Sequence, residues 1–369
     1  MTRSGPKRKV HPQITNVIEQ KIFSTLPLEM KPLQEHMLPV LDWSPEDVLP
    51  SLKSAAQLSG NCFWQLKCLV LEFLPGVLDA LRKRLEECPV VNQIPLHQTE
   101  QYPMPAMKLD ESTLDDTIEV METIVRIVME INDKQLKAHG LMVGDGDLLT
   151  HALKDKLESA RRNSTTPIAG MQASLGRWGL FHSQMAGGQL TINEHWSTPN
   201  LLWPGGLWWE HNKLLERKPM AAGWGGKKAT EWKPAHELIH ILLPAHIFDG
   251  FRSYCRHENL EEWAKTTTYS EFEAVAKTVS DELFSTAALD KIRAHPVQNI
   301  TLENTILSNH DTLFYVKFGP AIKKGDIGRV LNVLGIWMVM MHSPKTMPRY
   351  ADATFERLVK PKSFPPKLQ

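Results

Sequence analysis

The sequence predicts a mainly α-helical chain with a small parallel βαβ element, and therefore an α+β fold class. Most of the 369 residues fall into segments whose apolar side chains recur every three or four positions, as on one face of a helix. Only two short runs have the apolar character of buried strands. A helical segment separates these two runs, which is the order of a strand, crossover helix and parallel strand. We therefore expect a sheet of two to four short strands among many helices.

The composition is that of a folded protein with no net charge. The 42 Lys and Arg residues balance the 42 Asp and Glu residues, which argues against a globally basic nucleic-acid-binding protein. The chain has no apolar run of membrane-spanning length, and its N-terminus lacks the apolar stretch of a signal peptide. We expect an intracellular protein without a membrane partner. The four cysteines form no Cys-x-x-Cys pair, which favours free thiols.

Five segments are expected along the chain. Residues 1–37 are predicted to be loosely ordered and basic. Lys7, Arg8 and Lys9 in this segment can be interpreted as a nuclear address or as part of a solvated tail, with a cytoplasmic location as the alternative. The other segments are a helical block over 38–95, a proline-rich linker over 96–111, a main domain over 112–359 and a frayed tail over 360–369.

The elements follow from local patterns, taken in chain order. An apolar stripe from Cys62 to Glu87 predicts a helix that packs against others, and Ser112–Asp115 is typical of a capping box that begins a helix ending near Leu136. The two predicted strands are His139–Gly144 and Leu175–Phe181, with a helix over Leu148–Arg162 between them. Residues 197–233, rich in Gly, Pro and Trp, are predicted to be a partly ordered excursion. The later predicted helices are 234–255, 268–293, 300–318, 325–341 and 349–359.

Two carboxylates and a histidine follow the predicted strands. Asp145 and Asp147 lie at the end of the first strand, and His182 lies at the end of the second. Open α/β sheets keep their sites at this edge, and carboxylates there bind Mg²⁺ or Mn²⁺ when further oxygen ligands are present. These three residues are therefore the catalytic candidates. The alternative is that Asp147 caps the helix that follows it.

A second pattern, His236-Glu237-x-x-His240, is typical of zinc hydrolases. The two histidines share a helix face, and the glutamate between them would polarise a zinc-bound water. His246 lies ten residues after His236, where a longer metalloprotease pattern has its third ligand. That pattern needs glycine where Leu243 stands. We therefore predict that no zinc site forms here and expect no cofactor, with the zinc hydrolase as an alternative.

Several short motifs together resemble a known family. They are Gly146–Thr150, Gly179–Met185, His195–Trp196, Asn212–Pro219 and Ala321–Val330, followed by Trp337 and Tyr350–Ala351. This set resembles the fungal (basidiomycete) domain of unknown function 6589 family, over about residues 110–358. The resemblance implies no established activity. The chain lacks the upstream Asp-Asn motif and the later Glu-His-x-Asn motif of related sequences, which implies that a metal site built on them would be incomplete.

Three functions remain open on this basis. The favoured one is a non-catalytic or truncated relative of a transposon-encoded protein. The second is an active transposase or nuclease with a truncated RNase H-like core, because the order strand, Asp147, helix, strand, His182 resembles that of cut-and-paste transposases. The third is the zinc hydrolase.

We also predict a partly exposed basic edge formed by Lys323, Lys324 and Arg329, with Asp326 at the next helix N-cap. Weak nucleic-acid binding is the partner that this edge suggests.

Overall fold

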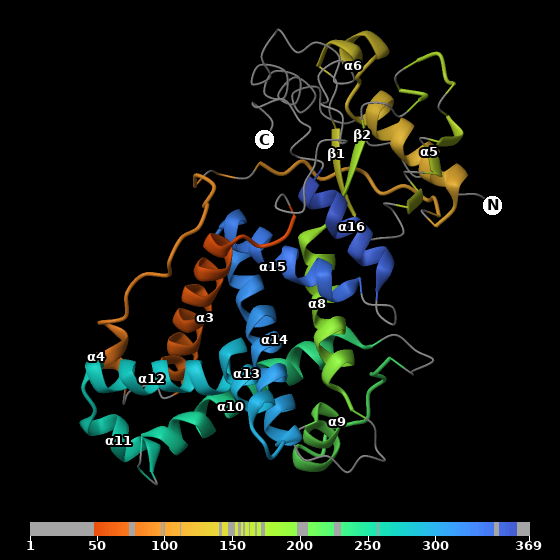
Figure 1. Ribbon diagram of the computed structural model, residues 1–369. Helices are drawn as coiled ribbons and strands as arrows, with labels where there is room; N and C mark the ends of the chain where they lie inside the picture. Colours follow the sequence, from red (N-terminus) through yellow and green to blue (C-terminus); the bar gives the residue numbers. More distant parts are fainter. Residues whose placement is uncertain are drawn as a thin grey trace, which may run out of the picture. The chain divides into compact units, whose positions relative to one another are not determined.

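The computed structural model describes a defined part of the chain. It describes residues 48–359 except for 74–77, 97, 99, 111, 140–141, 147–151, 154–155, 158, 162, 167, 171–173, 198–205, 225–229, 256, 258 and 343–346. The predicted basic segment 1–37, with Lys7, Arg8 and Lys9, lies outside the described residues, and so does the predicted tail 360–369. Within them the protein is mainly helical, as predicted (Figure 1).

The chain divides into two compact units. The first unit includes Leu96–His182, and the second combines Ser44–Pro95 with Ser183–Leu358. Most of the predicted helical block over 38–95 thus belongs to the same unit as residues more than a hundred positions further along the chain.

Helices of the first unit begin where side chains cap them. Helix α5 (Leu114–Thr123) begins after Thr113, whose hydroxyl accepts a hydrogen bond from the Asp116 amide. A short π-helix, η3 (Ile124–Val128), follows, and then α6 (Asp133–His139). The prediction of one continuous helix to Leu136 is therefore wrong. Glu130 adopts a φ of 54°, which ends the helical path, and Asn132 begins a new one by exchanging hydrogen bonds with Gln135.

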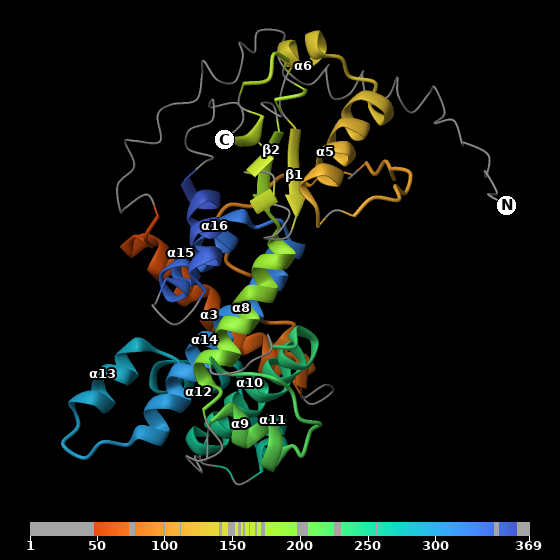
Figure 2. The ribbon, with the colours of Figure 1, turned by 90° about the vertical axis from the view of Figure 1, so that its right-hand side faces the viewer.

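Two short strands complete the described elements of this unit. Strand β1 (Met142–Gly146) pairs in parallel with β2 (Ser174–Trp178), as Figure 2 shows. The register runs from Met142 opposite Ser174 to Gly146 opposite Trp178. Trp178 is buried at the end of the second strand. The unit has a small apolar cluster, formed by Val125, Ile131, Leu136 and Ile168 with Met129 packed against it.

The predicted α+β class is wrong, and the fold is mainly α-helical. Within the described ranges, the two strands pair only with each other. Glycines at 144, 146 and 176 occupy three of the ten paired positions, so the ladder offers few side chains with which to build a packed layer. The crossover between the strands is only partly described, and no βαβ unit is established. A truncated RNase H-like core, which would need a wider sheet, is not supported.

The second unit is a group of packed helices. Its elements are α3 (Leu52–Phe73), α4 (Asp79–Arg82), α8 (Leu180–His195, entering from the first unit), α9 (Leu207–Trp209), η5 (Glu210–Leu214), α10 (Trp232–Tyr254), α11 (Leu260–Thr266), α12 (Tyr269–Leu283), α13 (Thr286–Ala294), α14 (Ile300–Lys323), α15 (Ile327–Met341) and α16 (Pro348–Val359). Helix α14 lies at the centre, because it packs against α3, α10, α12, α13 and α15 (Figures 1 and 2).

Helices α10, α15 and α16 match their predicted segments within about two residues at each end, whereas α14 continues to Lys323, beyond the predicted end at 318, and α11 was not predicted. The predicted helix over 268–293 divides into α12 and α13. Thr268 begins α12 with a capping box that includes Glu271, and Ser285 caps α13 by accepting from the Ala288 amide. None of the helices in the described part of the chain has the length and apolar character needed to cross a bilayer.

A pair of glycines lets α8 approach the helices around α14. A Cβ atom on Gly187 would lie 2.3 Å from the Trp337 ring, and one on Gly188 would lie 3.0 Å from the Tyr315 ring. Only a residue without a side chain permits the contact at Gly187, and a side chain at Gly188 would require the Tyr315 ring to shift. The close approach brings the last turn of α8, with His195, to the polar middle of α14.

Candidate functional site

The predicted carboxylate site lies only partly within the described residues. Asp145 is a residue of β1, opposite Arg177 in the ladder. Asp147 lies outside the described residues. His182 is not at the end of a strand but in the first turn of α8, because β2 ends at Trp178, and its ring stands edge-on to Phe181.

The predicted zinc ligands do not converge on one point. His236 and His240 are neighbours on α10, with ring centroids 4.3 Å apart, and Nδ1 of His236 lies 2.7 Å from the Tyr315 hydroxyl. Glu237 pairs with Arg217 at 2.7 Å. Burial lowers the pKa of His236, and burial together with His236 lowers the pKa of His240 to about 4, so both rings are neutral near pH 7.

His246 has both ring nitrogens engaged elsewhere. Nδ1 lies 2.6 Å from Oδ1 of Asn309, and Nε2 lies 2.9 Å from Oε1 of Glu210. Neither nitrogen is therefore left for a metal. In the part of the chain that the structure describes, no group of three or more His, Cys, Asp or Glu side chains is arranged to hold a metal ion.

The protonation of His246 follows from its hydrogen bonds. The Asn309 amide nitrogen donates to the Leu283 carbonyl, so its oxygen must accept from Nδ1 of His246. Nε2 then meets the Glu210 carboxyl group. Burial by itself lowers the pKa of His246, but the hydrogen bonds and charge of Glu210 outweigh burial and raise it. This hydrogen-bonded pair joins η5 to α10, with the Glu210 side chain buried and the His246 ring partly buried.

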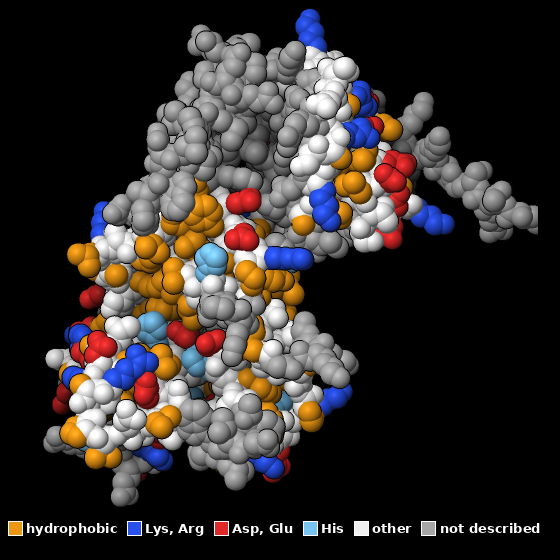
Figure 3. Space-filling view, turned by 45° about the vertical axis from the view of Figure 1, so that its right-hand side comes forward, with side chains coloured by type: hydrophobic (Ala, Val, Ile, Leu, Met, Phe, Trp, Pro, Cys, Tyr) orange, Lys and Arg blue, Asp and Glu red, His pale blue; other side chains and the backbone are white. Residues whose placement is uncertain are grey.

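Asp311 is a second buried carboxylate, held between two imidazoles. Nε2 of His195 lies 2.8 Å from one oxygen, and Nδ1 of His310 lies 3.0 Å from the other. Burial by itself raises the pKa of Asp311. The hydrogen bonds from the two imidazoles lower the pKa by more than burial raises it, and the result is a pKa of about 2. The carboxylate is therefore charged near pH 7, and each imidazole donates to it. On the face of the protein seen in Figure 3, histidine and acidic side chains lie among hydrophobic ones.

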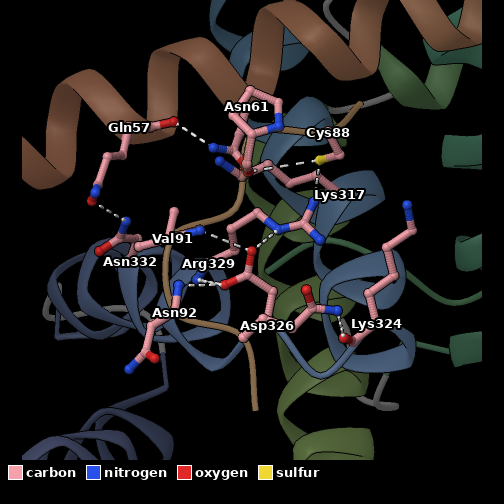
Figure 4. Close-up of polar contacts among 12 residues, drawn as sticks. Gln57, Asn61, Cys88, Val91, Asn92, Lys317, Lys324, Asp326, Arg329 and Asn332 are labelled. Atoms are coloured by element: carbon pink, nitrogen blue, oxygen red, sulfur yellow. Dashed lines mark hydrogen bonds and ion pairs between the residues drawn. The ribbon is translucent and has the colours of Figure 1, made fainter. Parts of the chain in front are cut away.

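The turn between α14 and α15 carries a third buried carboxylate, shown in Figure 4. Asp326 caps α15, as predicted, by accepting from the Arg329 amide at 3.2 Å. Its oxygens also accept from Nε of Arg329 at 2.8 Å and from the amides of Val91 and Asn92 at 3.1 and 2.9 Å. Burial raises the pKa of Asp326, and the amides and Arg329 lower it below its usual value.

Backbone contacts join the same turn to residues 91–94. Gly325 has a φ of 65°, and its carbonyl accepts from the Ile94 amide at 2.9 Å. The Gly328 amide donates to the Asn92 carbonyl at 3.2 Å. A Cβ atom on Gly328 would lie 2.5 Å from the Val91 side chain. The motif Ala321–Val330 is thus the surface on which residues 91–94 are held.

The predicted basic edge is smaller than expected. Lys323 and Lys324 are exposed at the end of α14. Arg329 is 5% exposed and points inward, where it bonds Asp326 and donates to the Cys88 sulfur at 2.8 Å. The prediction that Arg329 joins an exposed edge is therefore wrong, because its buried carboxylate partner holds the guanidinium inside.

Lys317 is a buried lysine that was not among the predicted site residues. It is 2% exposed, and its Nζ lies 3.4 Å from the Leu58 carbonyl and 3.5 Å from the Cys62 sulfur. Asp311 and Glu210 are two further buried charged residues that were not among the predicted site residues. A sequence signal existed for Lys317 alone, because it interrupts the apolar run from Leu313 to Phe318 in the helix predicted over 300–318.

The comparisons with known proteins give one match. The model of a family of unknown function, DUF6589, matches residues 42–369. The searches of curated proteins and of solved structures found no significant match.

Proposed function

The chain belongs to the family of unknown function DUF6589, and we propose that it is a non-catalytic helical binding protein. We further propose that Lys323 and Lys324, at the turn between α14 and α15, contact the phosphate backbone of a nucleic acid. The residues of this turn match the late motif of the family resemblance, so the proposed contact lies within the matched region.

The charge of the turn carries this proposal. Asp326 and Arg329 neutralise each other in the interior, 2.8 Å apart and at most 5% exposed. Lys323 and Lys324 therefore leave the surface of the turn with two positive charges. The inner bonds also fix the backbone on which the lysines stand, so little ordering is needed when a phosphate binds.

The non-catalytic part of the proposal is supported by how the acids are used. Glu210, Asp311 and Asp326 each bond histidine or arginine side chains of the protein itself. A carboxylate whose oxygens already accept hydrogen bonds from the protein has fewer lone pairs left for a divalent cation. Descent from a transposon-encoded protein stays a prediction, because it rests on the sequence order of Asp147 and His182.

Fluorescence anisotropy with labelled duplex DNA and duplex RNA tests the contact. We expect weak binding of the full chain that falls as salt rises from about 50 to 200 mM, because phosphate contacts release counterions. Lys323→Glu/Lys324→Glu should lower the salt slope by about two or abolish binding. A matched control, Lys265→Glu/Lys277→Glu, changes the same charge at two exposed lysines of α11 and α12 and should bind as the parent does. Equal binding by the first variant, or binding that salt does not change, would contradict the proposal.

A further inference from the structure

Helices α3 and α14 bring a thiol and an amine into contact in the second unit. Sγ of Cys62 lies 3.5 Å from Nζ of Lys317, and the two residues come from elements that pack directly on each other. Lys317 is 2% exposed, and Cys62 as a whole residue is half-buried.

We propose that Cys62 and Lys317 are a modification site at which a peroxide joins α3 to α14 through a covalent sulfur–nitrogen bond. The site is separate from the Lys323–Lys324 contact, so the two proposals can fail independently.

The surroundings of Lys317 favour a neutral amine. Its polar contacts among the described residues are the Leu58 carbonyl at 3.4 Å and the Cys62 sulfur, and the Phe314 ring centroid lies 5.0 Å away. These are poor substitutes for the water that an ammonium group loses on burial. Burial accordingly lowers the pKa of Lys317. A neutral amine keeps the lone pair with which it can attack sulfur.

The bond forms in two balanced steps. The Cys62 sulfur attacks one oxygen of hydrogen peroxide, the O–O bond breaks, and the products are a sulfenic acid and one water. In this step the sulfur loses two electrons and the peroxide gains them. Nζ of Lys317 then attacks the sulfur, the S–O bond breaks, and the hydroxyl group leaves with an amine proton as a second water. The chain loses two hydrogens overall, and a thiol reductant restores both side chains.

The first step is expected to be slow. Burial raises the pKa of the Cys62 thiol, although Lys317 offsets part of this effect, so the thiolate fraction is small. In the second step the Lys317 amine is already in contact with the sulfur. Once the sulfenic acid exists, the amine therefore needs no diffusion to reach it.

The test uses the full chain with Cys62 as its one thiol. Cys68→Ser/Cys88→Ser/Cys255→Ser leaves Cys62 alone among the four cysteines and so excludes an intramolecular disulfide. After exposure to hydrogen peroxide, we expect a species that joins the Cys62 and Lys317 peptides with a mass two hydrogens below the sum of the two, and we expect dithiothreitol to restore the separate peptides. The comparison is made on these peptides, because the 15 methionines also gain oxygen from peroxide. Peptide mapping should show the Cys62 peptide joined to the Lys317 peptide.

Two further variants separate this bond from other oxidation. Lys317→Met removes the amine but keeps a long buried side chain, and it should abolish the mass loss. Lys67→Met is the matched control, because Lys67 is also a buried lysine but lies on α3 and pairs with Glu273. In this variant the mass loss should persist. Circular dichroism verifies that each variant is folded. Oxygen addition without hydrogen loss, or hydrogen loss that persists in Lys317→Met, would overturn the proposal.

If a variant does not fold, the unmodified parent chain still decides the question. Peptide mapping of the parent after peroxide treatment should find the Cys62–Lys317 link. A link between Cys62 and Cys88 in its place, or no link, would overturn the proposal.

Discussion

At the scale of single residues, the second unit is organised by charged side chains inside a helical core. Asp326, Asp311 and Glu210 are each at most 8% exposed, and each bonds a basic side chain. Removing one partner of such a pair leaves the other buried without compensation, which costs more than the pair contributes. These residues should therefore dominate the response of stability to substitution and pH.

Asp326→Ala should lower the free energy of unfolding by about 3–5 kcal/mol, because Arg329 and two backbone amides lose their acceptor. Asp326→Ala/Arg329→Met should be less destabilised, since the buried unpaired charge is also removed. Asp249→Ala is the control: Asp249 forms an exposed pair with Arg252, and its loss should cost less than about 1 kcal/mol. Urea denaturation measures all three. An equal decrease in the free energy of unfolding for Asp326→Ala and Asp249→Ala would show that the buried pair stabilises the protein no more than the exposed pair does.

The pH dependence of stability should report Asp311. Its folded pKa, about 2, is depressed below the unfolded value of about 4, so between these values the unfolded state binds more protons. The stabilisation from Asp311 is therefore complete above about pH 4 and is lost as the pH falls toward 2, and its size is about 2 kcal/mol. The difference in urea stability between the parent and Asp311→Asn should shrink over this range. A difference that stays constant from pH 6 to pH 2 would contradict the assignment.

At the scale of elements, close helix contacts depend on residues without side chains. Gly187 lets α8 meet Trp337 of α15, and Gly325 and Gly328 shape the turn that holds residues 91–94. The same residue type has the opposite effect in an exposed helix, where it only adds freedom to the unfolded chain. The environment of each glycine decides the sign of a substitution.

Gly187→Ala should destabilise the protein by about 1–3 kcal/mol, because the new methyl group would lie 2.3 Å from the Trp337 ring. Gly60→Ala is the matched control on α3. A Cβ there meets nothing within 4 Å, so alanine should stabilise the helix by about 0.5–1 kcal/mol. Thermal unfolding should shift the two midpoints in opposite directions. A stabilising Gly187→Ala would show that α8 can move away from α15 at little cost.

At the scale of the whole molecule, the described residues form two units, and the second is built from two distant parts of the sequence. Residues 44–95 and 183–358 fold together although the first unit lies between them in the chain. Contacts of this kind have high sequence separation, such as the 235 positions between Val91 and Asp326. Forming such a contact costs more conformational entropy than forming a local one, because a long loop must close.

The full chain is expected to show no DNA cleavage or strand transfer. A two-metal site needs clustered carboxylates to offset the repulsion between two divalent cations, and Asp145 with Asp147 is too small a set. The measurement compares the parent with Asp147→Ala on supercoiled and linear DNA in Mg²⁺ or Mn²⁺. Asp147→Ala should lower the free energy of unfolding by about 1 kcal/mol, as expected for the loss of a helix cap. Metal-dependent nicking by the parent that Asp147→Ala abolishes would overturn this expectation.

The sequence by itself determined what depends on near neighbours. Apolar periodicity located α10, α14, α15 and α16 within a few residues, and the residue type of Asp326 identified it as the cap of α15. Both signals are local, because a helix face and an N-cap involve residues only a few positions apart. Such signals could not show where α5 stops, since the break at Glu130 is a backbone conformation and not a residue pattern.

Only the tertiary structure decided which charged groups meet. Asp311 bonds His195, 116 positions away, and Arg329 turns inward because Asp326 and Cys88 lie beside it. The same sequence region, read alone, placed Arg329 on an exposed edge. The two glycine-rich strands likewise suggested an α+β fold, yet they pair only with each other within the described residues. Packing between distant segments sets burial, and burial determines whether a charged side chain faces solvent or a partner.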